Sequence, residues 1–96
     1  MINVTVEFEI APKQLAKFLS LISSFSKTCL TQQGCVGHSH IQNGNRITMS
    51  EQFASDNDYQ RHRVSDYHIK FKQQSADCII NKTVSINENQ SGHEVG

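Results

Sequence analysis

The first ten residues alternate between apolar and polar side chains. Successive side chains of a β-strand point to opposite faces, so this two-residue period predicts a strand over residues 2–10. Its apolar face would consist of Ile2, Val4, Val6, Phe8 and Ile10. A strand with this pattern packs one face against a core.

The next segment changes to a spacing of three and four residues between apolar side chains, which predicts a helix from Pro12 to Leu30. Pro12 suits the first helical position, because its missing amide proton is not needed there. Gly34 can adopt the left-handed conformation that closes a helix, so we expect the chain to turn there. Six side chains form the apolar stripe, which we interpret as core: Leu15, Phe18, Leu19, Ile22, Phe25 and Cys29.

Asn43-Gly44 is a strong signal for a two-residue hairpin, because both central positions of a type I′ turn need positive φ angles. We therefore predict one strand over residues 35–42 and another over residues 45–53. One face of the later strand would carry Ile47, Met49, Glu51 and Phe53.

A second helical region is predicted from Ser55 to Gln74. Ser55 stands three residues before Asp58, the spacing of an N-cap whose hydroxyl accepts a hydrogen bond from the third amide. We expect a break near Val64-Ser65, with Ser65 as a second cap. Polar rings stand where leucines are usual on one helical face, which is formed by Tyr59, His62, Asp66 and Ile69.

Apolar residues alternate again from Ala76 to Ile86, with Lys82 interrupting the apolar face, and they predict a fourth strand. The resulting order, βαββαβ, is that of a ferredoxin-like α+β fold: an antiparallel sheet with two helices on one face. The other face mixes polar and apolar residues, so we expect a partner to cover it. We assign residues 1–86 to a single domain and residues 87–96 to a flexible C-terminal tail without a function.

Composition narrows the function classes. Nine basic and nine acidic residues give no net charge, and no cluster of Lys or Arg is present, which argues against a nucleic-acid partner or a membrane surface. No apolar run is long enough to span a bilayer and no targeting pattern is visible, so we expect a cytoplasmic protein. Three cysteines without Cys-x-x-Cys spacing indicate neither a disulfide framework nor a zinc ribbon.

Histidines supply the candidate chemistry. His38 and His40 are two residues apart on one predicted strand, so they would share a face; they could bind a metal, or they could be surface or dimer-facing side chains. His62 has Asp58 and Asp66 one turn to each side, and these could raise its pKa or fix its tautomer. Such a histidine can move a proton near neutral pH, or it can be an exposed residue with acidic neighbours.

His62 and His68 are six residues apart, or about 240° around a regular helix, so both face inward only if the helix breaks between them. Phe53 at a strand end and Tyr59 would then supply flat walls for an aromatic ligand. The alternative is that both rings are core aromatics beneath the helix.

An ordered motif extends over this region: Glu51-x-Phe53-x-Ser55, then His62, then Ser65-x-x-His68-x-x-Phe71. With Gly34-Cys35 upstream and the predicted order of elements, residues 2–86 resemble the antibiotic-biosynthesis monooxygenase (ABM) domain family, which includes small quinol monooxygenases. The resemblance implies a homodimeric α+β barrel with two sheets paired back to back. It also implies a cofactor-independent monooxygenase that oxidises a small aromatic or quinol-type substrate with O2.

The resemblance carries over two site residues, and the expected substrate-binding residues are chosen from the side chains around them. His62 and His68 would be catalytic, as base or phenolate partner. The iron-binding histidine of heme-degrading relatives falls near Lys72, so heme is not expected. The resemblance implies a reaction without flavin, other cofactor or metal, and the sequence places no further ligand to complete a metal site with His38 and His40. The expected substrate-binding residues are Phe53, which stands where the family usually has Trp, Met49, which stands where it has Asn, and Tyr59, Tyr67 and Phe71.

The sequence leaves two function classes open. The first is a monooxygenase in which His62 and His68 handle the substrate proton. The second is a non-catalytic dimeric module that binds or senses a small molecule in the same cavity. A closed pocket with no titratable group facing it would favour the second class.

Overall fold

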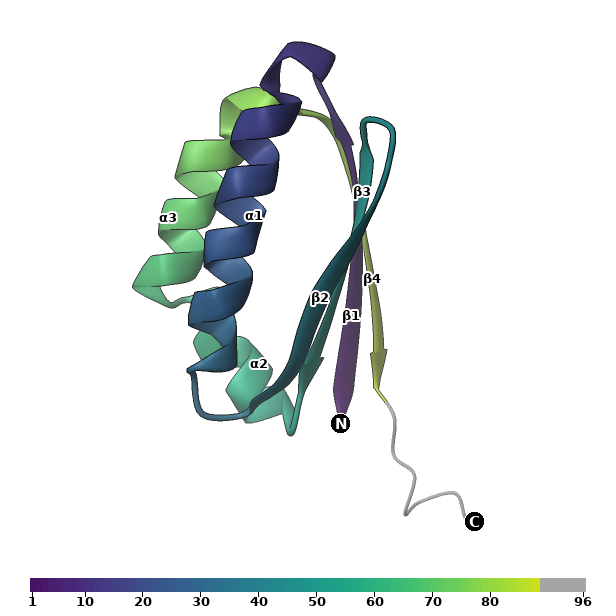
Figure 1. Cartoon of the computed structure of the whole chain (residues 1–96). Coiled ribbons are helices and arrows are strands. Elements are labelled where there is room, and N and C mark those ends of the chain that lie inside the picture. Colours follow the sequence, from purple (N-terminus) through teal and green to yellow (C-terminus); the bar gives the residue numbers. More distant parts are fainter. Residues whose placement is uncertain (89–96) are drawn as a thin grey trace.

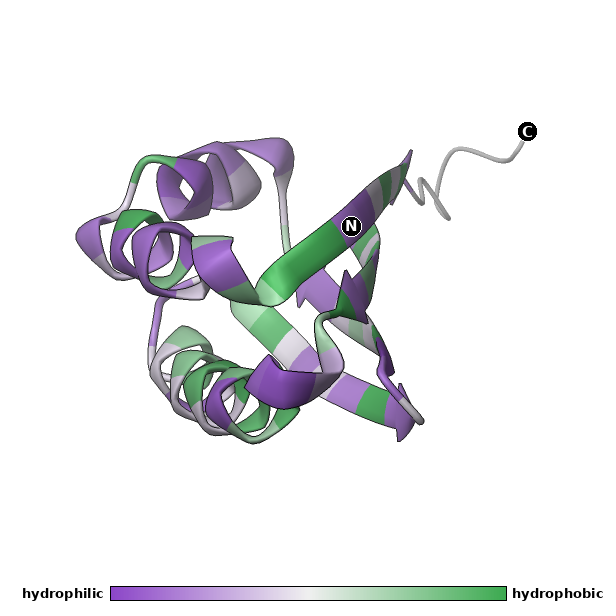
Figure 2. Cartoon of the chain, turned by 90° about the horizontal axis from the view of Figure 1, so that it is seen from above, coloured by the Kyte–Doolittle hydropathy of each residue, from purple (hydrophilic) through white to green (hydrophobic). Residues whose placement is uncertain are grey.

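The computed structural model describes residues 1–88 and consists of an antiparallel sheet with helices on one side (Figures 1 and 2). The strands lie in the order β2-β3-β1-β4. This arrangement confirms the predicted ferredoxin-like α+β fold. In chain order the elements are β1 (Ile2–Ile10), the 3-10 turn η1 (Pro12–Gln14), α1 (Leu15–Leu30), β2 (Cys35–Asn43), β3 (Arg46–Phe53), α2 (Asp56–Arg63), α3 (Asp66–Ser75), the 3-10 turn η2 (Ala76–Cys78) and β4 (Ile79–Glu88).

The register of the sheet sorts side chains between its two faces. Val6 of β1 lies opposite Met49 of β3 and Val84 of β4, so these three side chains point toward the helices. The five predicted apolar residues of β1 are all buried, and Phe8 packs against Phe18 of α1 with ring centroids 4.9 Å apart. The alternation in β1 therefore identified the core face of the sheet.

The outer face of the sheet is more polar than we expected. Its side chains on β1, β3 and β4 are almost all Asn, Thr, Ser, Gln, Glu or Arg. The edge strand β2 adds Ile41 to this face, at 72% exposure. The exposed apolar side chains of β4 include Val84 and Ile86, which lie on the helix-facing side. They are exposed because the helical layer packs over the other strands and leaves β4 largely uncovered.

The hairpin between β2 and β3 differs from the predicted turn by one residue. Asn43 pairs with Arg46, so the two-residue loop is Gly44-Asn45 rather than Asn43-Gly44. Gly44 has a φ of 62° and none of the described non-glycine residues has a positive φ. A positive angle at the first loop position alone fits a type II′ turn, not the type I′ turn that we predicted.

The helical region after β3 breaks where expected. Ser55 caps α2 by accepting the Asp58 amide at 3.2 Å, and Ser65 caps α3 by accepting the His68 amide at 3.4 Å. The Ser65 hydroxyl also donates to the His62 carbonyl at 2.6 Å, which closes the end of α2. The two short helices therefore replace one continuous helix and set His62 and His68 at new angles to each other.

Other bounds also differ from the predicted ones. Pro12–Gln14, predicted as the first turn of the first helix, form the 3-10 turn η1, and α1 begins at Leu15. Residues Ala76–Cys78, predicted as the start of the last strand, form the turn η2, and β4 begins at Ile79. β4 continues through Asn87 and Glu88, two residues expected to belong to the tail. The other residues of the expected tail, 89–96, lie outside the described part of the chain. Among the described residues, none of the helices combines the length and apolar character needed to cross a membrane.

Candidate functional site

A buried carboxylate, Glu51, lies between two imidazole rings. Its Oε2 atom is 3.0 Å from Nε2 of His38 and 3.4 Å from Nε2 of His62. β3 supplies the glutamate, while the histidines come from β2 and α2. The three side chains are at most 4% exposed. A buried carboxylate is stable only with such partners, so these contacts tie α2 to the sheet.

The electrostatics of Glu51 fix the proton positions around it. Burial alone would raise the pKa of the Glu51 carboxyl, but hydrogen bonds from His38 and His62 outweigh it and lower that pKa from 4.5 to about 2. Glu51 is therefore ionised and only accepts hydrogen bonds. We therefore place a hydrogen on Nε2 of each imidazole, where it faces Glu51, so that Nδ1 is the ring nitrogen that faces away from the carboxylate.

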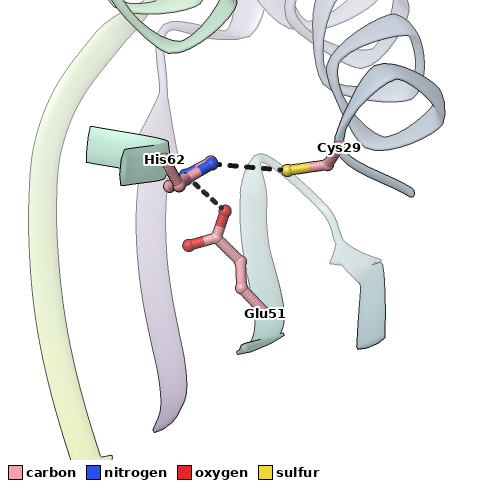
Figure 3. Close-up of side chains that lie close together, drawn as sticks. All are labelled: Cys29, Glu51 and His62. Atoms are coloured by element: carbon pink, nitrogen blue, oxygen red, sulfur yellow. Dashed lines mark hydrogen bonds and ion pairs between the residues drawn. The ribbon is translucent and has the colours of Figure 1, made fainter. Parts of the chain in front are cut away.

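The Nδ1 atoms of both rings also have partners. Nδ1 of His38 is 2.9 Å from the Ser26 hydroxyl. Nδ1 of His62 is 2.7 Å from the Tyr67 hydroxyl and 3.6 Å from Sγ of Cys29. Figure 3 shows Cys29, Glu51 and His62 converging from three different elements. We call these residues the buried network: Ser26, Cys29, His38, Glu51, His62 and Tyr67.

One thiol and one hydroxyl of the buried network, those of Cys29 and Tyr67, stay protonated. Burial raises the pKa of the Cys29 thiol and of the Tyr67 hydroxyl far above their ordinary values. A protonated Tyr67 can donate its hydrogen to Nδ1 of His62, the atom that the Glu51 contact leaves as an acceptor. His62 thus has a polar neighbour at each ring nitrogen.

His68 is held differently. Its Nδ1 is 3.0 Å from the backbone carbonyl of Arg63, and because a carbonyl only accepts, Nδ1 carries the hydrogen. Burial lowers the pKa of His68 below 6.5, which favours the neutral ring near pH 7. The lone pair of the neutral ring is then on Nε2, for which the structure shows no hydrogen-bond partner among the described residues. This ring lies 4.6 Å from that of His62, centroid to centroid.

Two cavities meet at His62. The main cavity has a volume of about 360 Å³ and lies between the sheet and the helices. The side cavity, of about 260 Å³, lies at the end of α1 beside α2. His62 lines both cavities. The remaining lining of the main cavity is Val4, Val6, Phe8, Phe25, Met49, Glu51, Tyr59, Arg63, His68, Phe71, Lys72, Lys82, Val84 and Ile86, and that of the side cavity is Gln32, Gln33, Cys35, Phe53, Asp58, Arg61, Ser65 and Tyr67.

The structure divides the seven predicted site residues between these cavities. The main cavity brings five of them together: His62, His68, Met49, Tyr59 and Phe71. Phe53 and Tyr67 line the side cavity instead. Phe53 is 1% exposed and its ring lies 4.8 Å from that of His62, so it packs against the histidine without lining the main cavity.

The predicted acidic partners of His62 were wrong. Asp58 bonds instead to the Ser55 hydroxyl at 2.8 Å and to Arg61 at 3.1 Å. Asp66 begins α3 after the helix break, so it is no longer one regular turn from His62. The carboxylate that contacts His62 comes from β3, eleven positions earlier in the sequence.

His38 is not the surface histidine that we expected. Its side chain is fully buried, and its ring also lies edge-on to that of Phe25 at 5.3 Å. His40 points to the same side of the sheet, opposite Met49, and is partly buried. The pair does not form a metal site among the described residues: the candidate ligand group there is Cys29, Glu51 and His62, whose donor atoms lie within 4.8 Å of one another. Those atoms already bond to one another or to neighbours in the buried network, so we interpret the group as part of that network.

Sequence reasoning missed two important residues. Glu51 was placed on the apolar face of its strand, and a carboxylate among Ile47, Met49 and Phe53 was the available signal that a buried partner faces it. Phe25 was assigned to the core, yet it lines the main cavity and stacks on Phe71 at 4.2 Å with an angle of 14° between the rings. No signal in the helical stripe distinguished Phe25 from its core neighbours.

Comparison with known proteins gives one matching family model and several solved structures with the same fold. A family model described as antibiotic biosynthesis monooxygenase matches residues 1–74. A conserved protein from Methanosarcina mazei is 20% identical with a TM-score of 0.87, covering 93% of this chain and 92% of its own. A candidate antibiotic biosynthesis monooxygenase from Nitrosomonas europaea is 13% identical with a TM-score of 0.88, covering 94% and 99%.

A further solved structure, a candidate antibiotic biosynthesis monooxygenase from Caulobacter crescentus, is 14% identical with a TM-score of 0.86 and covers 92% of this chain and 88% of its own. At these identities the solved structures establish the fold alone. No curated protein matches the chain.

Proposed function

The chain belongs to the antibiotic biosynthesis monooxygenase family, and from this premise we propose that it oxidises a small aromatic or quinol-type substrate with O2. The observation that supports the proposal most directly is that His68, whose Nε2 has no hydrogen-bond partner among the described residues, lines the main cavity. Proteins of this family are often monooxygenase-like. The resemblance implies that they use neither metal nor flavin.

The first step that we propose is removal of a phenolic proton by His68. A general base needs a lone pair within reach of the substrate and a pKa below or near the working pH. His68 suits this role, because the Arg63 carbonyl holds the hydrogen on Nδ1, burial lowers the pKa of the ring, and the residue lines the main cavity. His62 has both ring nitrogens engaged, so we assign it the role of a fixed neighbour rather than of the base.

The second step is the reaction of the substrate anion with O2. Removal of the proton makes the ring electron-rich, and O2 accepts electrons from it; one oxygen atom enters the ring and the other leaves as water. For hydroquinone the product is a hydroxybenzoquinone, which balances the atoms of the two reactants. The stacked rings of Phe25 and Phe71 and the side chain of Met49 would hold the aromatic ring away from bulk water.

The binding-module alternative has less support. It would be favoured by a cavity without a titratable group, whereas the lining of the main cavity includes two histidines and Glu51. Both alternatives predict binding of an aromatic molecule, and only the enzyme consumes oxygen. Turnover therefore distinguishes them.

We also propose that the protein works as a homodimer. Proteins of this family are often dimers. Ile41 of β2 lies on the outer face of the sheet, is 72% exposed, and supplies apolar area that a second subunit would bury. Light scattering should report twice the mass of the chain, and a stable single-chain species would contradict the proposal.

Oxygen uptake with hydroquinone tests the proposed reaction. The wild-type protein should consume O2 and form hydroxybenzoquinone that carries the label when the gas is isotopically heavy oxygen. The H68Q variant should lose roughly a hundredfold or more in rate, the usual contribution of a general base. Spontaneous oxidation gives benzoquinone and hydrogen peroxide instead, so catalase identifies that background.

H40Q is the matched control, because His40 lies on the sheet but lines neither the main nor the side cavity. It should retain the wild-type rate. Equal rates for wild type and H68Q would exclude His68 as the base. Binding of hydroquinone without labelled product would instead favour the binding module.

A further inference from the structure

Three cations from three different elements line the main cavity. Arg63 comes from α2, Lys72 from α3 and Lys82 from β4. All three are exposed, whereas most of the other lining residues are buried, so the cations occupy the outer rim of the cavity. The acidic member of the lining is Glu51, which is buried at the inner end with its two histidines. The main cavity thus has an anionic inner end and a cationic rim.

Lys82 stands at an unusual position for a lysine. It lies opposite Phe8 in the register and therefore points to the helix-facing side of the sheet, between the apolar side chains of β4. Its ammonium group is 6.0 Å from the centroid of the Phe8 ring. This lysine interrupts the apolar alternation of the strand, and neither the fold nor the proposed proton transfer accounts for it.

The two lysines of the rim have no direct partner of opposite charge among the described residues, and the carboxylate that acts on Lys82 is the buried Glu51. Within residues 1–88, the structure shows neither an ion pair nor a side-chain hydrogen bond for Lys72 or Lys82. Burial, and then the like charge of Lys72, lower the pKa of Lys82. Arg63 differs, because its guanidinium donates to Gln60 at 3.1 Å and lies 6.0 Å from the Tyr59 ring. Two unpaired ammonium groups near one cavity repel each other, and a bound anion would offset that repulsion.

We propose that the main cavity binds an aromatic substrate that carries an anionic group such as a carboxylate, with that group at Lys82 and Lys72. The phenolic hydroxyl would then point inward to His68, and the ring would lie between them against Phe25 and Phe71. The ionised Glu51 at the inner end disfavours the reverse orientation. The direction of the hydroxyl rests on the proposed function, whereas the preference for an anion does not.

Equilibrium binding under nitrogen tests this preference without any turnover. The probes are gentisate, a hydroquinone with a carboxylate, and gentisamide, its neutral amide. The full-length protein should bind gentisate about fivefold more tightly than gentisamide, a difference in the range of partly exposed ion pairs. Added salt should reduce this ratio, since it screens exposed charges.

Variants of Lys82 identify the residue responsible. K82Q should weaken gentisate binding severalfold and leave gentisamide binding unchanged, whereas K82R should keep the preference because it keeps the charge. K13Q is the matched control, since Lys13 lies in η1 and lines neither cavity; it should behave as wild type. Equal affinity of the wild-type protein for both probes, or an equal loss in K13Q and K82Q, would overturn the proposal. Because no oxygen is present, a failure of the proposed monooxygenase reaction would leave this result unaffected.

Discussion

The buried network and the main cavity share His62 but differ in how their polar atoms are satisfied. In the network, Glu51 bonds to two imidazoles, and Nδ1 of each imidazole contacts a hydroxyl group. Among the described residues, no buried side-chain nitrogen or oxygen lacks a hydrogen bond. In the cavity, Nε2 of His68 and the ammonium group of Lys82 have no such partner in the described chain.

This difference separates positioning from reactivity. Groups whose hydrogen bonds are all made within the protein hold their geometry and stabilise the fold, and they have no donor or acceptor left for a ligand. Groups without partners beside a cavity are available to a substrate. Loss of a network residue should therefore affect stability first, whereas loss of a cavity residue should affect binding or rate.

The largest effect on stability is expected for E51Q. The amide cannot supply the negative charge that both imidazoles face, so the variant should lose about 3 kcal/mol of unfolding free energy, as when one partner of a buried pair is removed. Urea denaturation near neutral pH measures the change. E9Q is the matched control on the sheet, because Glu9 is 3.8 Å from an exposed Arg46; it should change stability by less than about 0.5 kcal/mol. Similar values for the two variants would show that the Glu51 contacts contribute little.

Y67F should have an intermediate effect. Removal of the hydroxyl takes away the 2.7 Å partner of His62 Nδ1 and leaves only the weaker Cys29 thiol at 3.6 Å, at an expected cost of about 1 kcal/mol. Y59F is the matched control, because no hydrogen bond of the Tyr59 hydroxyl is found among the described residues. Thermal unfolding of both variants should show the larger decrease in Tm for Y67F. The opposite order would contradict the assigned network.

The smallest expected effect is the pH dependence of the unfolding free energy that His68 causes. Its pKa in the folded state is below the ordinary 6.5, so the folded state binds fewer protons than the unfolded state just below that pH. The contribution of His68 is complete above pH 6.5 and is lost as the pH falls through the lower, folded-state pKa. As the pH decreases from 6.5, the unfolding free energy of the wild type should therefore fall relative to that of H68Q. A shift in the other direction would show that the folded-state pKa is raised.

The sequence was sufficient for the elements but not for the partners of the site. Several local signals each predicted the structure around them: the alternation in β1, the caps at Ser55 and Ser65, and Gly34, whose φ is 89°. A Cβ at position 34 would also collide with Asp58, a constraint that no local signal carries. The fold class followed from the order of these elements.

The contacts of His62 depend on the sheet register and on the angle between α2 and α3. Asp58 and Asp66 were the sequence neighbours of His62, but the helix break and the Ser55 contact leave Glu51 as its carboxylate partner. β2 was too polar to reveal which face is buried, so the burial of His38 was not predicted. A pairing between β2 and β3 that aligns His38 with Glu51 is a property of the folded sheet.

The central claim is that His68 carries the available lone pair while His62 is held at both nitrogens. Nitrogen NMR of the histidine side chains near neutral pH tests it directly, because each tautomer has its own pattern of couplings. We predict a neutral His68 with its hydrogen on Nδ1, and a His62 with a hydrogen on Nε2 facing Glu51. A His68 that is protonated, or that carries its hydrogen on Nε2, would contradict the account.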